Sequence, residues 1–295
     1  MNVGILYSRI RTDEKLLLEE LRDRDHEVTK IDVRKQQFDL TEPPAAFEGI
    51  DVLVDRCLAT SRSLYVTRFA ERYGIPVINS ARTARICADK VENSLALAEA
   101  GVPTPTTRVA FTKAAALEIV EEFGYPCVLK PVVGSWGRLM AKIDSRSAAE
   151  AIFEHKATLG HYEHKVFYVQ EVVEKLGRDI RVLATDGEPV AAMVRESDHW
   201  ITNAAMGADT DPFDLDEEAR DLVSRASEAV GGGLLGVDLM EVEGENDHSY
   251  TVHEVNHNVE FKALDAAVNA DVPAHVVDWI ETRTSEELPA SEVEA

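Results

Sequence analysis

The first 80 residues alternate between short apolar runs and amphipathic segments of helical period. The apolar runs lie at residues 2–8, 27–33, 51–57 and 75–79, and the amphipathic segments at 13–26 and 63–74. Strands joined by helices of this length pair in parallel, because the helix carries the chain back to the starting end of the sheet. We therefore predict a small parallel sheet of the βαβ type. No GxGxxG follows the first run, so a dinucleotide site is not expected there.

The pattern of predicted helices and strands changes after residue 80. A helix is predicted over residues 83–101, ending at Gly101 with Pro103 just beyond it. From Tyr125 onward, short strands and hairpins dominate, with a tight turn at Asp186-Gly187, a helix over 215–232 and a second hairpin over 236–256. The fold class is α/β and α+β, with an N-terminal unit over 1–86, a larger unit over 87–282 and a frayed acidic tail over 283–295.

Charge and cysteine content exclude several classes of function. The formal net charge of −23 argues against binding nucleic acid through its phosphates. The acidity is spread along the chain and only 11 of the 31 basic residues are lysine, which indicates adaptation to high salt. No membrane span or signal peptide is visible, and Cys57, Cys87 and Cys127 lack metal-binding spacing. We expect a cytoplasmic protein that binds neither nucleic acid nor membrane.

Two segments could contact a nucleotide. In "VLKPVVGSWGRLMAKI", Lys130 precedes a loop with Gly134 and Gly137, where backbone N–H groups could approach a phosphate. A plain glycine hairpin is the alternative, and no Walker A motif is present. In "VFYVQEVVEKLGRDIRV", a strand becomes a linker at Gln170 and could offer its backbone to an adenine edge. An exposed hairpin edge explains that run equally well.

The stretch "HEVNHNVEFK" has Glu254, Asn256, Asn258 and Glu260 at every second position. This period places all four on one face of a strand, which is either a solvated edge or a cation site. Asp238 in "GVDLMEV" could approach Glu254 and Asn256 across a hairpin, and three hard oxygen ligands suit Mg²⁺. His253 and His257 are predicted on the opposite face. No convincing Ser/His/Asp or Cys/His constellation is apparent.

These segments occur in the order found in ATP-grasp ligases. Over residues 1–282 the chain resembles the LysX/ArgX ligases, which attach an amino acid to the acidic amino-group carrier protein LysW, with RimK-type ligases as the nearest relatives. The resemblance rests on "PVVGSWGRL", "GRDIRV", "HWITN", "GVDLMEV" and "HEVNH", the last departing from the family's NEVNH at His253. It implies an ATP-grasp fold preceded by a Rossmann-like pre-ATP-grasp domain.

The resemblance also implies roles for individual residues. Lys90 and Lys130 would contact the ATP phosphates, with Lys130 and Arg195 catalytic and Arg195 facing the incoming amino acid. The other implied nucleotide contacts are Gly134, Ser135, Trp136, Gly137, Arg138, Leu139, Met140, Gln170, Glu171, Val172, Val173, Glu174, Asp179, Arg181 and Asn203. Mg²⁺, as two ions, would be held by Asp238, Glu254 and Asn256. The amino-acid pocket would include Ala204, Ala205, Glu260, Phe261, Lys262, Ala263 and Leu264.

The implied reaction joins the carrier's C-terminal glutamate side chain to the amine of glutamate or α-aminoadipate through an acylphosphate, in a homo-oligomeric enzyme. In the relatives, the pair after "EFK" distinguishes the two amino acids. Here it is Ala263-Leu264, which matches neither pattern, and its apolar bulk favours glutamate and arginine biosynthesis. Two alternatives are an ATP-grasp enzyme acting on another protein tail or on small molecules, and a nucleotide-binding regulator without catalysis.

Overall fold

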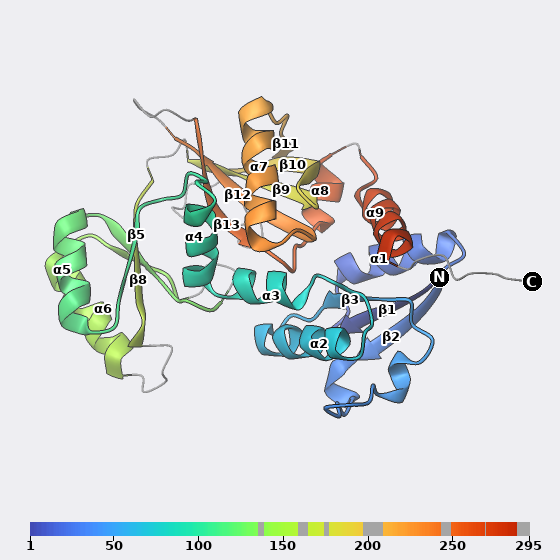
Figure 1. Ribbon diagram of the computed structural model, residues 1–295. Coiled ribbons are helices and arrows are strands. Elements are labelled where there is room, and N and C mark those ends of the chain that lie inside the picture. The colour runs from blue at the N-terminus through green and yellow to red at the C-terminus, as the bar shows by residue number, and fades with distance from the viewer. Residues whose placement is uncertain are drawn as a thin grey trace, which may run out of the picture.

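The computed structural model describes residues 1–134, 139–158, 165–173, 177–196, 209–242, 249–268 and 270–287. Within these ranges the chain forms three β-sheets, each covered by helices (Figure 1). No helix in the described ranges is long and apolar enough to span a lipid bilayer.

The N-terminal sheet is parallel, as the alternating sequence pattern predicted. Its strand order is β2-β1-β3-β4, formed by Asn2–Tyr7 (β1), Glu27–Asp32 (β2), Val52–Arg56 (β3) and Val77–Ile78 (β4). The helices are α1 (Thr12–Asp23) and α2 (Thr60–Arg72), with 3₁₀ turns η1 (Val33–Lys35) and η2 (Ala45–Phe47). Because all four strands are parallel, their carboxyl ends meet at one edge of the sheet.

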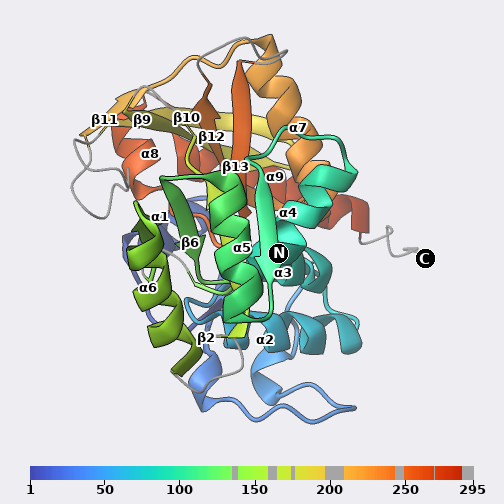
Figure 2. The ribbon, with the colours of Figure 1, turned by 90° about the vertical axis from the view of Figure 1, so that its left-hand side faces the viewer.

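A second sheet lies at the far end of the molecule from the termini (Figures 1 and 2). It has the order β5-β8-β6-β7, with strands Thr107–Ala110 (β5), Cys127–Lys130 (β6), Ala141–Ile143 (β7) and Phe167–Glu171 (β8). Helices α5 (Lys113–Phe123) and α6 (Arg146–Thr158) pack on it, and Phe153 of α6 contacts Phe167 edge-on with ring centres 5.2 Å apart. The sequence analysis did not predict these two helices.

The third sheet is antiparallel and occupies the middle of the molecule. Its order is β11-β10-β9-β12-β13, formed by Arg178–Thr185 (β9), Glu188–Glu196 (β10), Asp209–Pro212 (β11), Leu234–Glu241 (β12) and Tyr250–Asn256 (β13). The predicted turn joins β9 to β10, with positive φ angles of 46° at Asp186 and 89° at Gly187. Side chains alternate along β9, so Val182 packs in the core under α7 (Glu217–Val230) and Leu183 in the core on the other face.

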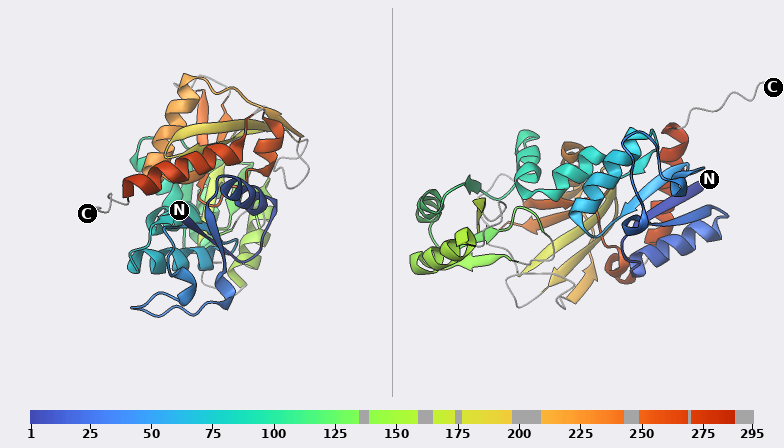
Figure 3. Two further views of the ribbon diagram at one scale, coloured as in Figure 1. Left: turned by 90° about the vertical axis from the view of Figure 1, so that its right-hand side faces the viewer. Right: turned by 90° about the horizontal axis from the view of Figure 1, so that it is seen from below.

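That other face is covered by the C-terminal helices. Helix α8 (Lys262–Ala267) and helix α9 (Val272–Glu287) pack between the central sheet and α1, which joins the N-terminal unit to the rest of the chain (Figure 3). Helix α9 contains residues 283–287, which the sequence analysis placed in the acidic tail. The tail prediction is therefore corrected to begin no earlier than residue 288, and residues 288–295 lie outside the described ranges.

The helix predicted over 83–101 is two helices, α3 (Ala81–Ala88) and α4 (Lys90–Glu99). Asp89 separates them with an extended backbone, and its carboxylate caps α4 by accepting hydrogen bonds from the N–H groups of Val91 and Glu92. The backbone also bridges to Val133, just after β6. This break turns the chain so that α4 begins with Lys90 beside the second sheet.

Asn79 connects three parts of the chain. Its side-chain Nδ2 donates to the carbonyl oxygens of Leu234 (2.9 Å) and His257 (2.6 Å), and its Oδ1 accepts from the N–H of Leu234 (2.6 Å). Gly233 lies against it with φ +113°, and a Cβ at that position would stand 2.0 Å from Asn79 Oδ1. The N-terminal sheet is thereby tied to the start of β12 and the end of β13.

Candidate functional site

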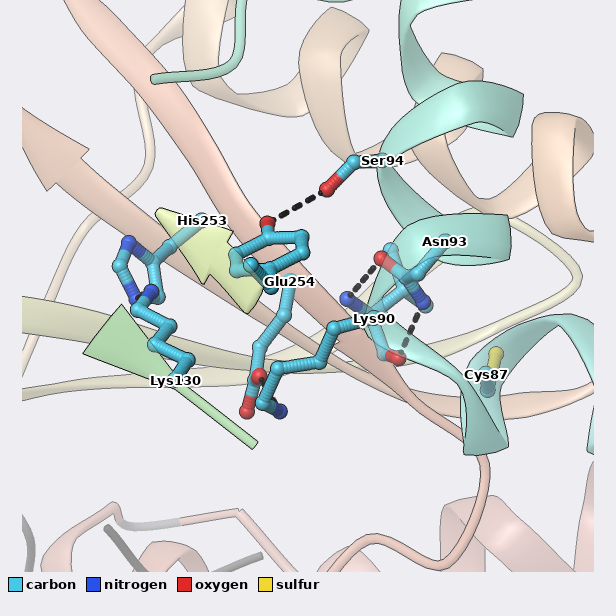
Figure 4. Close-up of a pocket in the computed structure, with 9 residues that line it drawn as sticks. Cys87, Lys90, Asn93, Ser94, Lys130, His253 and Glu254 are labelled. Carbon is cyan, nitrogen blue, oxygen red and sulfur yellow. Dashed lines mark hydrogen bonds and ion pairs between the residues drawn. The ribbon is translucent and has the colours of Figure 1, made fainter. Parts of the chain in front are cut away.

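A pocket lies where α4, β6, β8 and β13 approach one another. Its lining residues are Cys87, Lys90, Asn93, Ser94, Lys130, Tyr168, His253, Glu254 and Val255 (Figure 4). The helix α4 is fixed along β13 by Asn93, whose side chain donates to the carbonyl of Val255 (2.9 Å) and accepts from its N–H (3.2 Å). Both lysines predicted to contact phosphate therefore face one pocket, although 40 residues separate them in sequence.

Lys90 forms an ion pair with Glu254 in this pocket, with Nζ 2.6 Å from Oε2. Burial opposes ionisation of the carboxyl group, but the charge and hydrogen bond of Lys90 contribute most to outweighing it and lower the pKa of Glu254. Burial likewise opposes the ammonium form of Lys90, and the charge of Glu254 raises the pKa of Lys90. Both groups are charged at neutral pH.

Lys130 is 3% exposed, and its contacts include acceptors on strands β8 and β13. Its Nζ donates to Oε1 of Gln170 at 2.5 Å and to Nε2 of His253 at 2.6 Å. Gln170 is oriented for this role because its Nε2 donates to Thr107 Oγ1 (2.8 Å) and Tyr168 OH (3.1 Å), which leaves Oε1 toward the lysine. The backbone at Gln170 was predicted to contact adenine, which stays a prediction, and the Gln170 side chain orients Lys130.

The prediction that His253 faces away from Glu254 is wrong. Asp238 pairs with Glu254 and the next residue, Leu239, pairs with Val252, so His253 is an extra residue in β13. Such a β-bulge interrupts the alternation of side chains. His253 and Glu254 consequently line the same pocket, and the imidazole reaches Lys130.

The three predicted metal ligands are adjacent, but they already have partners. Asp238 is buried and receives a two-bond contact from Arg181 (2.6 and 2.8 Å) and a third bond from Arg195 (2.9 Å). Asn256 donates its Nδ2 to Glu254 Oε1 (3.2 Å) and to Asp238 Oδ2 (3.4 Å), which leaves its Oδ1 as an oxygen donor. Within the described ranges, no group of three or more His, Cys, Asp and Glu side chains is arranged to hold a metal.

Arg195, predicted to face the amino acid, is buried and bonds Asp179 (2.5 Å) as well as Asp238. Asp179, predicted to contact the nucleotide, is therefore part of an arginine–carboxylate network that lies on the same face of the central sheet as Glu254. Glu171 accepts a hydrogen bond from the N–H of Thr106 (2.6 Å), and Val172 and Val173 are half-buried.

The second half of the "HEVNHNVEFK" stretch is not a strand. β13 ends at Asn256, and Asn258 and Glu260 turn to the N-terminal unit. Asn258 Nδ2 donates to the carbonyl of Cys57 (2.7 Å), and Glu260 pairs with Arg11 (2.6 Å). The regular spacing of four oxygen-bearing residues therefore reflects two separate sets of contacts.

Residues 260–264, predicted to line the amino-acid pocket, lie between the N-terminal and central sheets. Asp13 Oδ1 accepts hydrogen bonds from the N–H groups of Phe261 (2.7 Å) and Lys262 (2.9 Å), and Lys262 is exposed. The side chains of Phe261 and Leu264 are wholly buried in the core, with Ala263 packed against it. Any influence of Leu264 on a ligand therefore acts from beneath the pocket surface.

Asp55, Ser63 and His257 meet in the structure, although the sequence analysis found no such constellation. Ser63 Oγ donates to Asp55 and lies 3.1 Å from His257 Nε2. Because the one hydroxyl hydrogen goes to Asp55, His257 is the donor in the second contact. A buried serine between the other two groups is not the arrangement of a hydrolytic triad, in which the histidine lies in the middle.

In the predicted loop after β6, Gly134 (φ +137°), Leu139 (φ +61°) and Met140 are described, and Leu139 is 74% exposed. Other predicted site residues lie outside the described ranges, namely Ser135, Trp136, Gly137, Arg138, Glu174, Asn203, Ala204 and Ala205. Asn93, Tyr168 and Thr107 were not among the predicted site residues, because no local pattern marks residues that act by orienting a distant side chain.

Comparison with known sequences gives matches along nearly the whole chain. The LysX preATP-grasp domain matches residues 3–86, and the RimK-like ATP-grasp domain matches residues 87–280. An alpha-aminoadipate–LysW ligase LysX from Saccharolobus solfataricus is 35% identical over 85% of this chain and 90% of its own length. A glutamate–LysW ligase ArgX from Sulfolobus acidocaldarius is 30% identical over 95% of this chain and 98% of its own.

Comparison with solved structures also gives a match along nearly the whole chain. The crystal structure of a RimK domain ATP-grasp protein from Sphaerobacter thermophilus superposes with a TM-score of 0.79 and 27% identity, covering 95% of this chain and 99% of that chain. The N-terminal parallel sheet and the two antiparallel sheets are thus shared with a known architecture.

Proposed function

This chain belongs to the RimK-like ATP-grasp family, with a LysX pre-ATP-grasp domain, and we propose that it ligates glutamate to the C-terminal glutamate of a LysW-type carrier protein. Membership confirms the resemblance seen in the sequence and the ATP-grasp fold, and it makes the chain an ATP-dependent carboxylate–amine ligase. The carrier is proposed because LysX and ArgX relatives match across most of the chain.

One observation of the site supports this function most directly. Lys90 and Lys130 come from opposite sides of the pocket and converge on the face of β13 that carries Glu254. Two ammonium groups can compensate the negative charge of a polyphosphate. The carboxylate beside them can hold the cation that accompanies it. The nucleotide's phosphates would then lie over the end of β13, with Gly134 in the loop above them.

The proposed reaction has two steps. A side-chain oxygen of the carrier's terminal glutamate attacks the γ-phosphorus of ATP and releases ADP, and the α-amine of the incoming amino acid then displaces phosphate to form the amide. Lys90 and Lys130 would stabilise negative charge as the phosphoryl group is transferred. No side-chain nucleophile is needed, which agrees with the buried, wrongly ordered Ser63 cluster.

The donor set fits Mg²⁺, which uses few protein ligands and completes its shell with water and phosphate oxygens. Glu254 and Oδ1 of Asn256 are the side-chain oxygens best placed to hold it, and Asp238 would contribute only by sharing its oxygens with Arg181. When bound, the ion would supply positive charge to the transferring phosphoryl group.

The first experiment replaces Glu254 by Gln in an assay with ATP, Mg²⁺, glutamate and the purified carrier. Glu241→Gln is the matched control, because Glu241 lies on the neighbouring strand and pairs with Arg178 away from the pocket. We expect E254Q to lose ligation while remaining folded, with a lower thermal midpoint because Lys90 loses its counterion, and E241Q to retain activity. Wild-type-like turnover by E254Q, or release of AMP and pyrophosphate, would contradict the mechanism.

The second experiment compares kcat/KM for glutamate and α-aminoadipate. The choice of glutamate rests on Ala263-Leu264, which lacks a polar group for a longer side chain. One methylene discriminates by only about 1–3 kcal/mol, so both substrates should react, with glutamate preferred. A preference for α-aminoadipate would assign the chain to lysine biosynthesis.

A further inference from the structure

Arg56, at the carboxyl end of β3, is wholly buried and joins three elements. Its Nε donates to Glu14 Oε1 of α1 at 3.1 Å, its Nη1 donates to the carbonyl of Val259 at 3.0 Å, and its Cζ lies 5.5 Å from the centre of the Phe261 ring. The remaining nitrogen, Nη2, is also buried and has no hydrogen-bond partner among the residues that the structure describes.

An unpartnered Nη2 is unusual because a guanidinium is always charged, and its buried N–H groups are almost always bonded. The rest of the guanidinium is fixed by Glu14, which also accepts from Arg11 (2.7 Å), and by a backbone carbonyl that cannot move away. Nη2 therefore has a defined direction. A guanidinium nitrogen held in this way is suited to a carboxylate oxygen.

The location restricts the ligand further. In sheets of this kind, ligands bind beyond the carboxyl ends of the parallel strands, where Arg56 lies. Arg56 contacts Phe261, which was predicted to line the amino-acid pocket, and the carbonyl of Val259 just before that segment. Arg11, bonded to the same Glu14, also pairs with Glu260, whose side chain is 42% exposed, so a chain of charged contacts connects Arg56 to the surface.

We propose that Nη2 of Arg56 binds a carboxylate of the amino-acid substrate and so selects acidic amino acids, an inference that rests on the proposed function. Arg56 is a binding residue here and takes no part in phosphoryl transfer. Its contact with Glu14 keeps the guanidinium in place before the substrate arrives. A carboxylate of the carrier's terminal residue is the competing ligand, and the experiment separates the two.

The test uses Arg56→Lys, which keeps a cation beside Glu14 but removes Nη2. The matched control is Arg34→Lys, since Arg34 follows strand β2 of the same sheet, bonds Asp32 at 2.8 Å and is half exposed. KM is measured for glutamate, carrier and ATP, and for glutamine and isoglutamine, in which one carboxylate of glutamate is an amide.

For R56K we expect KM for glutamate to rise about tenfold to a hundredfold, as for loss of one charged hydrogen bond, with KM for ATP and carrier within about twofold. The wild-type preference for glutamate over one of the two amides should shrink by the same factor. R34K should match the wild type. An unchanged KM for glutamate, or a rise for the carrier instead, would overturn the assignment.

Wild-type turnover with carrier and glutamate tests the proposed function separately, before any variant is compared. If R56K does not fold, the double variant Arg56→Met/Glu14→Gln replaces it, because removing both buried charges avoids leaving one unpaired. The same loss of discrimination between glutamate and its amides is expected of that protein, and retained discrimination would refute the proposal.

Discussion

Replacing Gly233 by alanine should be among the most destabilising single substitutions in this chain. The new Cβ would stand 2.0 Å from Asn79 Oδ1, in a backbone conformation of φ +113° that favours glycine. Moving the Asn79 side chain breaks three hydrogen bonds of about 1 kcal/mol each, and the backbone adds about 1–2 kcal/mol. We expect the free energy of unfolding to fall by about 4–5 kcal/mol.

The matched control is Gly74→Ala, where φ is +73° and no atom lies within 4 Å of the added Cβ. That variant should lose only the backbone contribution of about 1–2 kcal/mol. In an Asn79→Ala background, the obstructing amide is gone, and Gly233→Ala should cost as little as Gly74→Ala. Urea unfolding of the four variants measures these differences. Equal costs of Gly233→Ala with and without Asn79 would refute the reasoning.

Three further predictions concern the pocket and the thiols. His253→Ala should weaken ADP binding about tenfold to a hundredfold, because the imidazole holds Lys130 at 2.6 Å; an unchanged Kd in a fluorescence titration would exclude this role. Lys90 lowers the folded-state pKa of Glu254 against burial, so this group stabilises the fold above its ordinary pKa of 4.5, and that stability is lost as the pH falls further. The acid-induced drop in urea midpoint should therefore be smaller in Glu254→Gln. Burial raises the pKa of Cys127 to about 11, and Cys57 is also buried, so neither should react with a thiol reagent at pH 8 unless the protein is unfolded.

The parallel sheet could be predicted because both of its periodicities are local. Apolar runs of strand length and amphipathic segments of helix length require no knowledge of distant residues. The division of the helix at Asp89 was also marked in the sequence, since Asp89 and Glu92 have the spacing of a helix start, but the apolar pattern on both sides concealed it.

The details of the site could be predicted only in part. Motif order predicted Lys90, Lys130 and Glu254 at one nucleotide site, and the structure brings the three side chains to one pocket. The bulge at His253 could not be, because one extra residue in β13 is defined only by its pairing with β12. The prediction that Asn258 and Glu260 share a strand face with Glu254 was wrong. Their partners, Cys57 and Arg11, lie in the N-terminal unit, and no local pattern indicates contacts over that distance in sequence.

Lys90 and Glu254 form a charge-neutral pair in the site, beside the ammonium group of Lys130. Under the proposed function, phosphate is the eventual partner of the ammonium, and the metal ion is the eventual partner of the carboxylate. Each side chain thus serves as the counterion of the other until a nucleotide–metal complex arrives. The phosphate would then replace Glu254 as the partner of Lys90, and the metal ion would replace Lys90 as the partner of Glu254. Binding would then exchange the partners of this pair, so that neither buried charge lacks a counterion before or after the nucleotide arrives.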